Sequence, residues 1–268
     1  HNAEDDSAGV TATVEKTEIT PGHTQAVLTL DNGETVNLGV DSMRNSKMIA
    51  EAQKGEEFTY STMQTPRGGE FKVMLEDGTE VWLNADTRLR YPEKFSGNER
   101  RVEVDGEAYF KVAHDASRPF VIDAGAVRAR VLGTELNVRS YSGAEPHVTL
   151  VNGSVEVAET GDGAVVRIEP GEDAALSGGR LSVRDVNVDD FTCWREGIVY
   201  FDHEQLRNIL TELGSWYNVN VICRDKALLG RHYHYVFNRN AALEEALQLL
   251  NDVSDAEVRL ENGTIFID

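Results

Sequence analysis

Residues 73–83 read Val-Met-Leu-Glu-Asp-Gly-Thr-Glu-Val-Trp-Leu, with apolar side chains at alternate positions on both sides of Asp77-Gly78. Alternation with a period of two is typical of a half-buried β-strand. An Asp-Gly pair readily takes the positive φ angles of a tight hairpin turn. Residues 28–38 have the same design, with Asn32-Gly33 at the turn. The sequence therefore predicts two β-hairpins.

Short strands continue from the second hairpin to residue 186. Runs bounded by Gly, Pro or Asp predict strands at 101–105, 107–112, 119–123, 126–132, 135–141, 147–151, 154–158, 164–168, 173–176 and 180–186. This spacing indicates a mainly β domain with antiparallel strands, in the form of a jelly roll, a sandwich or a solenoid. The pattern leaves these three architectures open.

After residue 190 the hydrophobic period changes to about 3.6, which predicts helices. Leu206, Ile209, Leu210 and Leu213 fall 37 positions before Leu243, Ala246, Leu247 and Leu250, so one helix pattern occurs twice. Each repeat is predicted as a strand–helix–strand unit: 198–201, 203–217 and 219–223, then 232–237, 241–252 and 256–260, with a last strand at 264–267. These patterns predict three regions: an extension with a β-hairpin layer at 1–64, a β-rich domain at 65–190 and a small α+β domain at 191–268.

The chain is strongly acidic. Its 268 residues include 26 Lys and Arg against 46 Asp and Glu, a net charge of −20. This charge repels a phosphate backbone at long range, so nucleic acid is not expected as a partner. No run approaches the ~20 apolar residues of a membrane-spanning helix, and we expect a soluble piece.

No catalytic site or cofactor site is predicted. The nucleophile elbow G-x-S-x-G, the phosphate-binding G-x-x-x-x-G-K-[ST] and the zinc-peptidase H-E-x-x-H are all missing from the sequence. His232 and His234 share one strand face, but two imidazoles do not make a metal site, so no metal is expected. Cys193 and Cys223 are too few for a disulfide scaffold, and whether they pair is left open.

The three tryptophans stand in different contexts. Trp82 lies in a predicted strand, Trp194 begins the second domain and Trp216 ends a helix on its apolar side. Large rings in such places favour packing in the core or at a domain interface over a shared sugar-binding platform. A carbohydrate-binding β-sandwich is nevertheless kept as the alternative function, and a hydrolase of unfamiliar type as a third.

A long ordered series of motifs resembles the FecR-type anti-sigma regulators. The motifs are Thr65-Pro66-Arg67-Gly68-Gly69-Glu70-Phe71, residues 75–85, Leu89-Arg90-Tyr91-Pro92, Arg101-Val102, Gly106-Glu107-Ala108-Tyr109-Phe110-Lys111-Val112, Arg118-Pro119-Phe120 and residues 131–138. The C-terminal part is similar to the last domain of these regulators and to the STN module of secretins and TonB-dependent transporters. The sequence departs from the family at Leu136, where Phe is commoner, and at His232-Tyr233-His234-Tyr235.

The resemblance implies a signalling protein and no enzyme. It implies the periplasmic part of an inner-membrane anti-sigma factor, whose membrane helix and sigma-binding cytoplasmic segment are not in this chain. The expected partners are the N-terminal signalling domain of a TonB-dependent outer-membrane transporter and, through that missing segment, an extracytoplasmic-function sigma factor. A monomer is expected in isolation.

A sheet edge offers a physical route to such a partner, because an edge strand can accept a strand from another chain. The candidate edges are 219–223 and 232–237. We therefore hypothesise that the partner docks near five residues on these edges: Tyr217, Val219, Val221, Tyr233 and Tyr235. The alternative for each is packing beneath the helices of its own domain.

Overall fold

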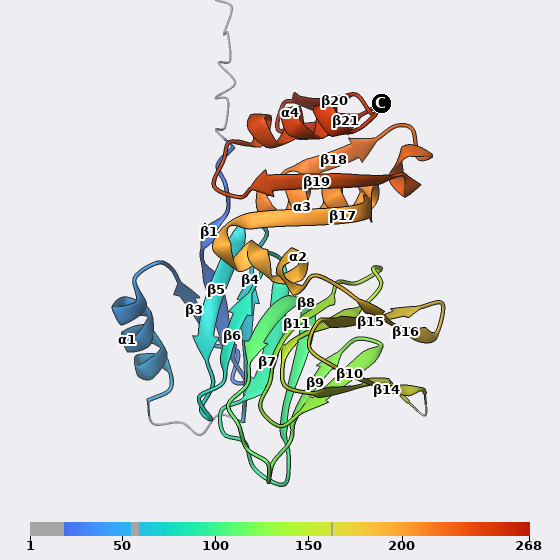
Figure 1. Ribbon diagram of the computed structural model, residues 1–268. Helices are drawn as coiled ribbons and strands as arrows, with labels where there is room; N and C mark the ends of the chain where they lie inside the picture. The colour runs from blue at the N-terminus through green and yellow to red at the C-terminus, as the bar shows by residue number, and fades with distance from the viewer. Residues whose placement is uncertain (1–18, 55–58, 162) are drawn as a thin grey trace, which may run out of the picture.

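A computed structural model describes residues 19–54, 59–161 and 163–268 (Figure 1). Residues 1–18 and 55–58 of the predicted extension lie outside the described residues. Figure 1 shows a β-rich unit below a smaller unit of strands and helices. The elements of the β-rich unit are β1 (His23–Thr24), β2 (Ala26–Leu30), β3 (Thr35–Leu38), α1 (Ser42–Ala52), β4 (Tyr60–Thr65), β5 (Gly69–Met74), β6 (Glu80–Leu83), β7 (Thr87–Pro92), β8 (Arg100–Lys111), β9 (Phe120–Ala124), β10 (Val127–Val131), β11 (Glu135–Ser140), β12 (His147–Asn152), β13 (Val155–Glu159), β14 (Val165–Ile168), β15 (Glu172–Ser177) and β16 (Arg180–Asp185).

The long strand β8 joins the two sheets of this unit. Residues 100–105 of β8 pair with β9 and β7, and residues 106–111 pair with β11 and β6. One sheet therefore runs β14-β13-β10-β9-β8-β7-β4-β2-β3, and the other runs β1-β5-β6-β8-β11-β12-β15-β16. The described strand pairs of this unit are antiparallel except β1 with β5 and β8 with β9.

Between the sheets lies one apolar core. Leu28, Met63 and Leu89 from one sheet join Val81, Leu136 and Leu150 from the other, and each of these side chains is at most 1% exposed. Burial of such side chains from water is the main favourable contribution to folding. Of the three architectures that the sequence leaves open, the structure is a sandwich of two sheets, and the prediction of a mainly β domain is confirmed.

The predicted hairpins are both present. Val73 pairs with Val81 in β5–β6, and Leu28 pairs with Val36 in β2–β3. The predicted strands 101–105 and 107–112 are one strand, because Gly106 takes a φ of 121° and bends β8 without ending it. Gly readily adopts positive φ because it has no Cβ.

Helix α1 was not expected from the sequence. Its N-cap is Asp41, whose side chain accepts a hydrogen bond from the backbone N–H of Arg44. Only Asn45 is buried, while Met48 and Ile49 pack partly against the core. A mostly polar helix gives too few apolar positions to show a period of about 3.6 residues.

The C-terminal unit consists of two related halves. Its elements are α2 (Val188–Thr192), η1 (Cys193–Glu196), β17 (Ile198–Gln205), α3 (Leu206–Trp216), β18 (Asn220–Cys223), η2 (Leu228–Gly230), β19 (His232–Asn238), α4 (Leu243–Val253), β20 (Val258–Glu261) and β21 (Thr264–Ile267). The two long helices have the same length and start 37 positions apart, as the repeat predicts. The helix predicted from residue 203 begins only at Leu206, because residues 203–205 continue β17 beyond a bulge.

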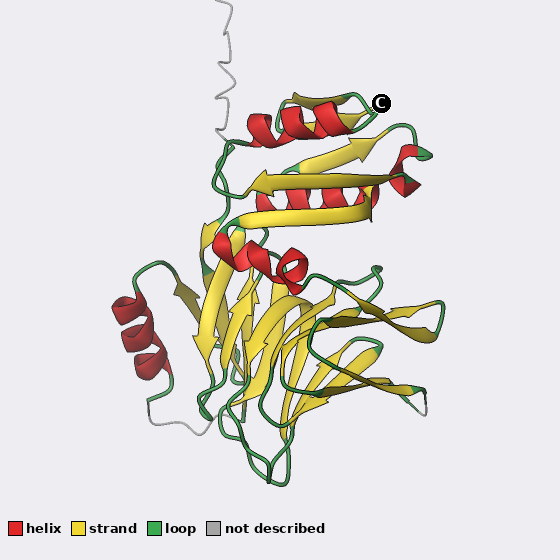
Figure 2. Ribbon diagram, in the orientation of Figure 1, coloured by secondary structure: helices red, strands yellow, loops and turns green. Residues whose placement is uncertain are grey.

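The two long helices of this unit, α3 and α4, lie between two small sheets. One sheet pairs β17 with β19, and the other has the order β18-β21-β20 (Figure 2). Both α3 and α4 contact strands of both sheets, so their leucines form one core with the inner faces of the strands. The outer face of β17 and β19 stays exposed at Ile198, Tyr200 and Val236. The prediction of a small α+β domain is confirmed.

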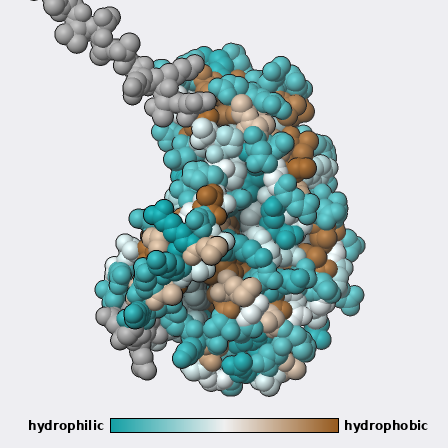
Figure 3. Space-filling view, turned by 90° about the vertical axis from the view of Figure 1, so that its left-hand side faces the viewer, coloured by the Kyte–Doolittle hydropathy of each residue, from teal (hydrophilic) through white to brown (hydrophobic). Residues whose placement is uncertain are grey.

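The surface is mainly hydrophilic on the face seen in Figure 3, with small, separate apolar patches. Among the described residues, no helix has both the length and the apolar character needed to cross a membrane. Cys193 and Cys223 are both free.

The bend of β8 at Gly106 gives a first prediction. A Cβ at this position would lie 2.7 Å from the Cα of Thr87, so Gly106→Ala adds a backbone clash to the strain of positive φ. We expect the free energy of unfolding to fall by about 3 kcal/mol in urea denaturation.

The matched control is Gly97→Ala, because Gly97 also has positive φ, 90°, but a Cβ there would meet no atom within 4 Å. Its cost is expected to be about 1 kcal/mol. Equal losses in the two variants would contradict the role of close packing at Gly106.

Candidate partner-binding edges and the domain interface

Three of the five predicted docking side chains lie inside the core of the C-terminal unit. Tyr217, Val219 and Tyr235 are each at most 5% exposed. The hydroxyl of Tyr217 donates to the carbonyl of Ala241, and that of Tyr235 donates to Ala246. Burial raises the pKa of Tyr217 to about 12, so this hydroxyl keeps its proton. These three side chains hold the helices against the sheets.

The other two are half-buried and lie on different sheets. Val221 is in β18 of the three-stranded sheet, and Tyr233 is in β19 of the two-stranded sheet. The Tyr233 hydroxyl donates to the carboxylate of Asp255. The structure therefore gives two separate edges, each with one of these half-buried side chains, instead of one five-residue patch.

Strand β18 has a neighbour on one side only among the described strands, namely β21. In this parallel ladder Val221 stands opposite Ile265, and the N–H of Arg224 donates to the carbonyl of Ile267. Backbone groups of a strand point alternately to its two sides. The groups of Ile222 and Arg224 therefore point to β21, and those of Val221 and Cys223 point away from it.

Strand β19 is also an edge, since it pairs only with β17 in the described chain. Near its start the structure brings a third imidazole to the two noted in the sequence: His203 stacks on His232 with ring centroids 4.6 Å apart, and it lies 6.0 Å from His234. Within the described residues, however, no group of three or more ligands is arranged to hold a metal ion.

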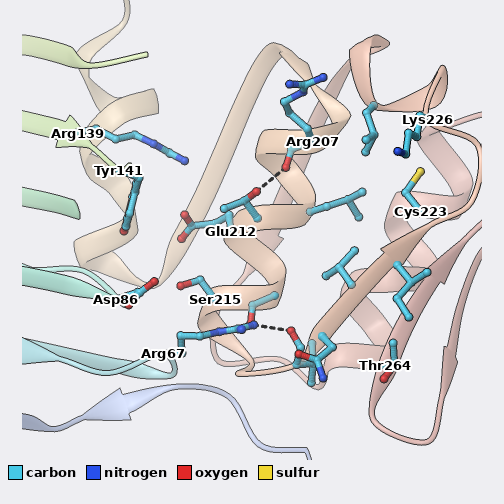
Figure 4. A pocket seen from close by; sticks show the side chains of 18 residues that line it. Arg67, Asp86, Arg139, Tyr141, Arg207, Glu212, Ser215, Cys223, Lys226 and Thr264 are labelled. Atoms are coloured by element: carbon cyan, nitrogen blue, oxygen red, sulfur yellow. Dashed lines mark hydrogen bonds between the residues drawn. The ribbon is translucent and has the colours of Figure 1, made fainter. Parts of the chain in front are cut away.

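A groove of about 790 Å³ lies beside β18 (Figure 4). All four residues of β18 line it, together with one face of α3 and residues of the β-rich unit. Arg67 and Arg139 enter the groove from the β-rich unit, whereas Arg207 and Lys226 enter it from the C-terminal unit. Burial raises the pKa of the Cys223 thiol, so the cysteine that lines the groove stays protonated at neutral pH.

Arg67 connects the two units at this groove. It comes from the turn between β4 and β5, and its Nη2 donates to the carbonyls of Gly214 and Val219 at 2.6 and 2.5 Å. Beside it, the backbone N–H of Gly68 donates to Ser215 at 2.7 Å. The end of α3 is thus fixed to the β-rich unit.

Arg239 forms a second connection and is only 1% exposed. Its guanidinium donates to Asn84 Oδ1 at 2.6 Å and to the carbonyl of Trp194 at 2.9 Å, and it lies 3.4 Å from the ring centre of Trp216. Glu70, 3.3 Å away, supplies a carboxylate. Burial lowers the pKa of the Arg239 guanidinium, and the carboxylates of Glu212 and Glu70 oppose this shift.

The network continues through Glu107 in β8. This carboxylate, 4% exposed, accepts from Asn84 Nδ2 at 2.8 Å and from Asn137 Nδ2 at 2.9 Å. The indole of Trp194 donates to Asn137 Oδ1 at 3.2 Å. Burial raises the pKa of Glu107 above its ordinary value, and the hydrogen bonds from the two amides oppose this rise.

Sequence reasoning missed this interface as a structural site. Arg67, Asn84, Glu107 and Asn137 all lie in the motifs that resemble the FecR family, although no spacing showed that they meet. The tryptophans were the one feature of the sequence that pointed to a domain interface, because packing in the core or at such an interface was predicted for them and is confirmed for Trp194 and Trp216. Trp82 is half-buried, with Lys72 Nζ 4.3 Å from its ring centre. None of the three indoles is thus a bare, fully exposed platform for a sugar.

Arg239 gives a second prediction. Arg239→Met keeps most of the side-chain length but removes the charged donor from Asn84 Oδ1 and from the Trp194 carbonyl, which keep only the backbone N–H groups of Ala85 and Gly197. We expect a loss of about 2–4 kcal/mol in the free energy of unfolding, measured by chemical denaturation. In the control Arg231→Met, only an exposed ion pair with Asp255 is lost, at a cost below about 1 kcal/mol. A loss as small as the control's would contradict the bridging role of Arg239.

The family model described as FecR protein matches residues 61–156, and the model described as FecR, C-terminal matches residues 198–267. No relative was found among curated proteins.

Among solved structures, the chain is similar to a candidate anti-sigma factor from Parabacteroides distasonis ATCC 8503, in crystal structures at 2.50 and 1.65 Å resolution. Both have 27% sequence identity and a TM-score of 0.73, and the match covers 78% and 77% of this chain and 98% of each of those chains. The two family matches together span more than half of the sequence, and the similar crystal structures have the same architecture. The chain therefore belongs to the FecR family of anti-sigma regulators.

Proposed function

We propose that this chain is the signal-receiving part of an anti-sigma factor, and that its 191–268 domain docks the N-terminal signalling domain of a TonB-dependent outer-membrane transporter. The observation that carries the proposal is the one-sided pairing of β18, which leaves backbone donors and acceptors on its outer side. Membership of the FecR family gives the proposal its biological setting.

An open edge is a physical means of recognition. A strand from a partner forms main-chain hydrogen bonds with the edge strand, and its alternate side chains then give specificity. Proteins usually protect such edges from unwanted pairing. An unprotected edge on a small domain of a regulator is therefore a reasonable docking site.

The two-unit structure suits transmission of the signal. In our proposal the 65–190 domain is a rigid spacer, and the 1–64 extension adds its hairpin layer to that spacer. The buried contacts of Arg239 and Arg67 favour one arrangement of the two units. A partner changes the state of the regulator only if it binds two arrangements with different affinities.

The rest of the pathway follows the family pattern. We propose that the chain works in the periplasm, anchored in the inner membrane by a helix outside this sequence. A cytoplasmic segment, also outside this sequence, would bind the sigma factor. No catalytic step is needed for this role.

Isothermal titration with the cognate signalling domain tests the proposal. The N–H of Val221 points away from β21, so Val221→Pro removes an outer donor without breaking the β18–β21 ladder. We expect this variant to bind at least about tenfold more weakly, through a lost main-chain bond and a ring that blocks close approach.

Tyr233→Asp is the parallel variant at the β19 edge. If Tyr233→Asp alone binds more weakly, the partner docks at β19 and not at β18. Wild-type affinity in both variants would overturn the placement on the two edges, and no binding by the wild-type chain would overturn the transporter as partner. Circular dichroism melting of each variant checks that the fold is kept.

A further inference from the structure

We propose that the groove beside β18 binds an extended acidic segment of a partner protein, which adds to β18 as a strand and places carboxylates against Arg207 and Lys226. This inference deepens the proposed function and rests on it in one respect: the transporter's signalling domain is taken as the protein that supplies the segment.

The backbone of β18 leaves a short open edge. The groups that point away from β21 belong to Val219, Val221 and Cys223. Val219 is already satisfied, because its N–H donates to the carbonyl of Gly214 and its carbonyl accepts from Arg67. Val221 and Cys223 are therefore the positions where a new strand would pair, and Arg67 marks the end of the open edge.

The charge of the groove is opposite to that of the chain. Four cationic side chains line it, those of Arg67, Arg139, Arg207 and Lys226, against the two carboxylates of Asp86 and Glu212. The chain as a whole has a net charge of −20. A locally cationic groove on an acidic protein attracts an anionic segment and holds it in register.

Two of these four cationic side chains already interact with groups of the chain itself. Arg67 donates to two carbonyls. The guanidinium of Arg139 lies 4.0 Å from the carboxylate of Glu107. Burial opposes the charged form of Arg139, whereas the carboxylates of Glu107 and Glu212 favour it and raise its pKa. Arg207 and Lys226 are exposed, and neither forms an ion pair with any carboxylate in the described parts of the chain. These two are therefore the cations available to a partner.

The groove also has an apolar wall. Leu210 of α3, Val221 of β18 and Leu229 line it beside these cations. In an added strand, alternate side chains point to opposite sides. A segment that alternates apolar and acidic residues would thus place one set against this wall and the other toward Arg207 and Lys226.

The β19 edge fits such a segment less well. Its neighbouring charges are already paired, since His234 Nδ1 lies 2.7 Å from Asp202 and Arg231 forms an ion pair with Asp255. An acidic strand at β19 would meet these carboxylates, whereas at β18 it meets cations without partners. Charge therefore favours β18.

The test uses a double charge reversal, Arg207→Glu with Lys226→Glu, in the full chain. Both side chains are exposed, and a glutamate in the first turn of α3 suits the helix dipole, so the fold should be kept. The matched control is Arg44→Glu with Arg180→Glu, which changes the net charge equally at two exposed arginines away from the groove, neither of which forms an ion pair in the described chain.

Two probes are titrated into each protein at low and high salt: the signalling domain, by calorimetry, and a fluorescent synthetic peptide that alternates valine with glutamate, by anisotropy. We expect the groove variant to bind each probe about tenfold more weakly than wild type, because two attractions become repulsions. The control should bind as wild type does. Added salt should weaken wild-type binding and have little effect on the groove variant.

The outcomes separate this inference from the proposed function. If the signalling domain binds wild type and the groove variant equally, the groove is not its site, although the transporter remains the partner. If the signalling domain fails to bind, but the acidic peptide binds wild type more tightly than the groove variant, the groove is confirmed as a site for an acidic segment. The transporter is then the wrong partner. Equal peptide binding by the groove variant and the control would overturn the acidic specificity.

Discussion

The buried guanidinium of Arg239 is the contact on which the arrangement of the two units most depends. A charge at 1% exposure is tolerated only when it is well paired and hydrogen-bonded, and every group that satisfies Arg239 comes from a different part of the chain. Asn84 and Glu70 belong to the β-rich unit, whereas Trp194 and Trp216 belong to the C-terminal part. Separating the units would take Asn84 and the paired carboxylate of Glu70 away from this charge, so the network favours one relative orientation.

Arg67 gives the interface a second role, because it also limits the open edge of β18. The side chain that fastens α3 to the β-rich unit is the one that occupies the outer carbonyl of Val219. A partner strand that extended past Val221 would compete with Arg67 for that carbonyl. The proposed docking edge and the junction between the units are therefore adjacent parts of one structure, which is a physical basis for coupling between them.

Much of the fold could be predicted from local patterns, whereas the interface could not. Alternating residues and Asp77-Gly78 determine a hairpin through neighbours in sequence, and the repeat of Leu206 at Leu243 marks two helices by spacing alone. Arg239 and Asn84 are far apart in the chain, and only the complete tertiary structure brings them together. For the same reason Tyr217 and Tyr235, proposed from the sequence as contacts for a partner, lie in the core of their own unit. The pattern showed that they were aromatic strand or helix residues, but not which side they faced.

The two halves of the C-terminal unit are interlocked, because neither sheet is built from one half alone. β17 of the first half pairs with β19 of the second, and β18 of the first half pairs with β21 of the second. When one half opens, the other loses the strand pairs that join β17 to β19 and β18 to β21, so the unit should unfold cooperatively, in a single all-or-none step. A ligand that binds only the folded edge of β18 would then raise the melting temperature of all the strands and helices of the unit together, including β17 and β19, which it does not touch.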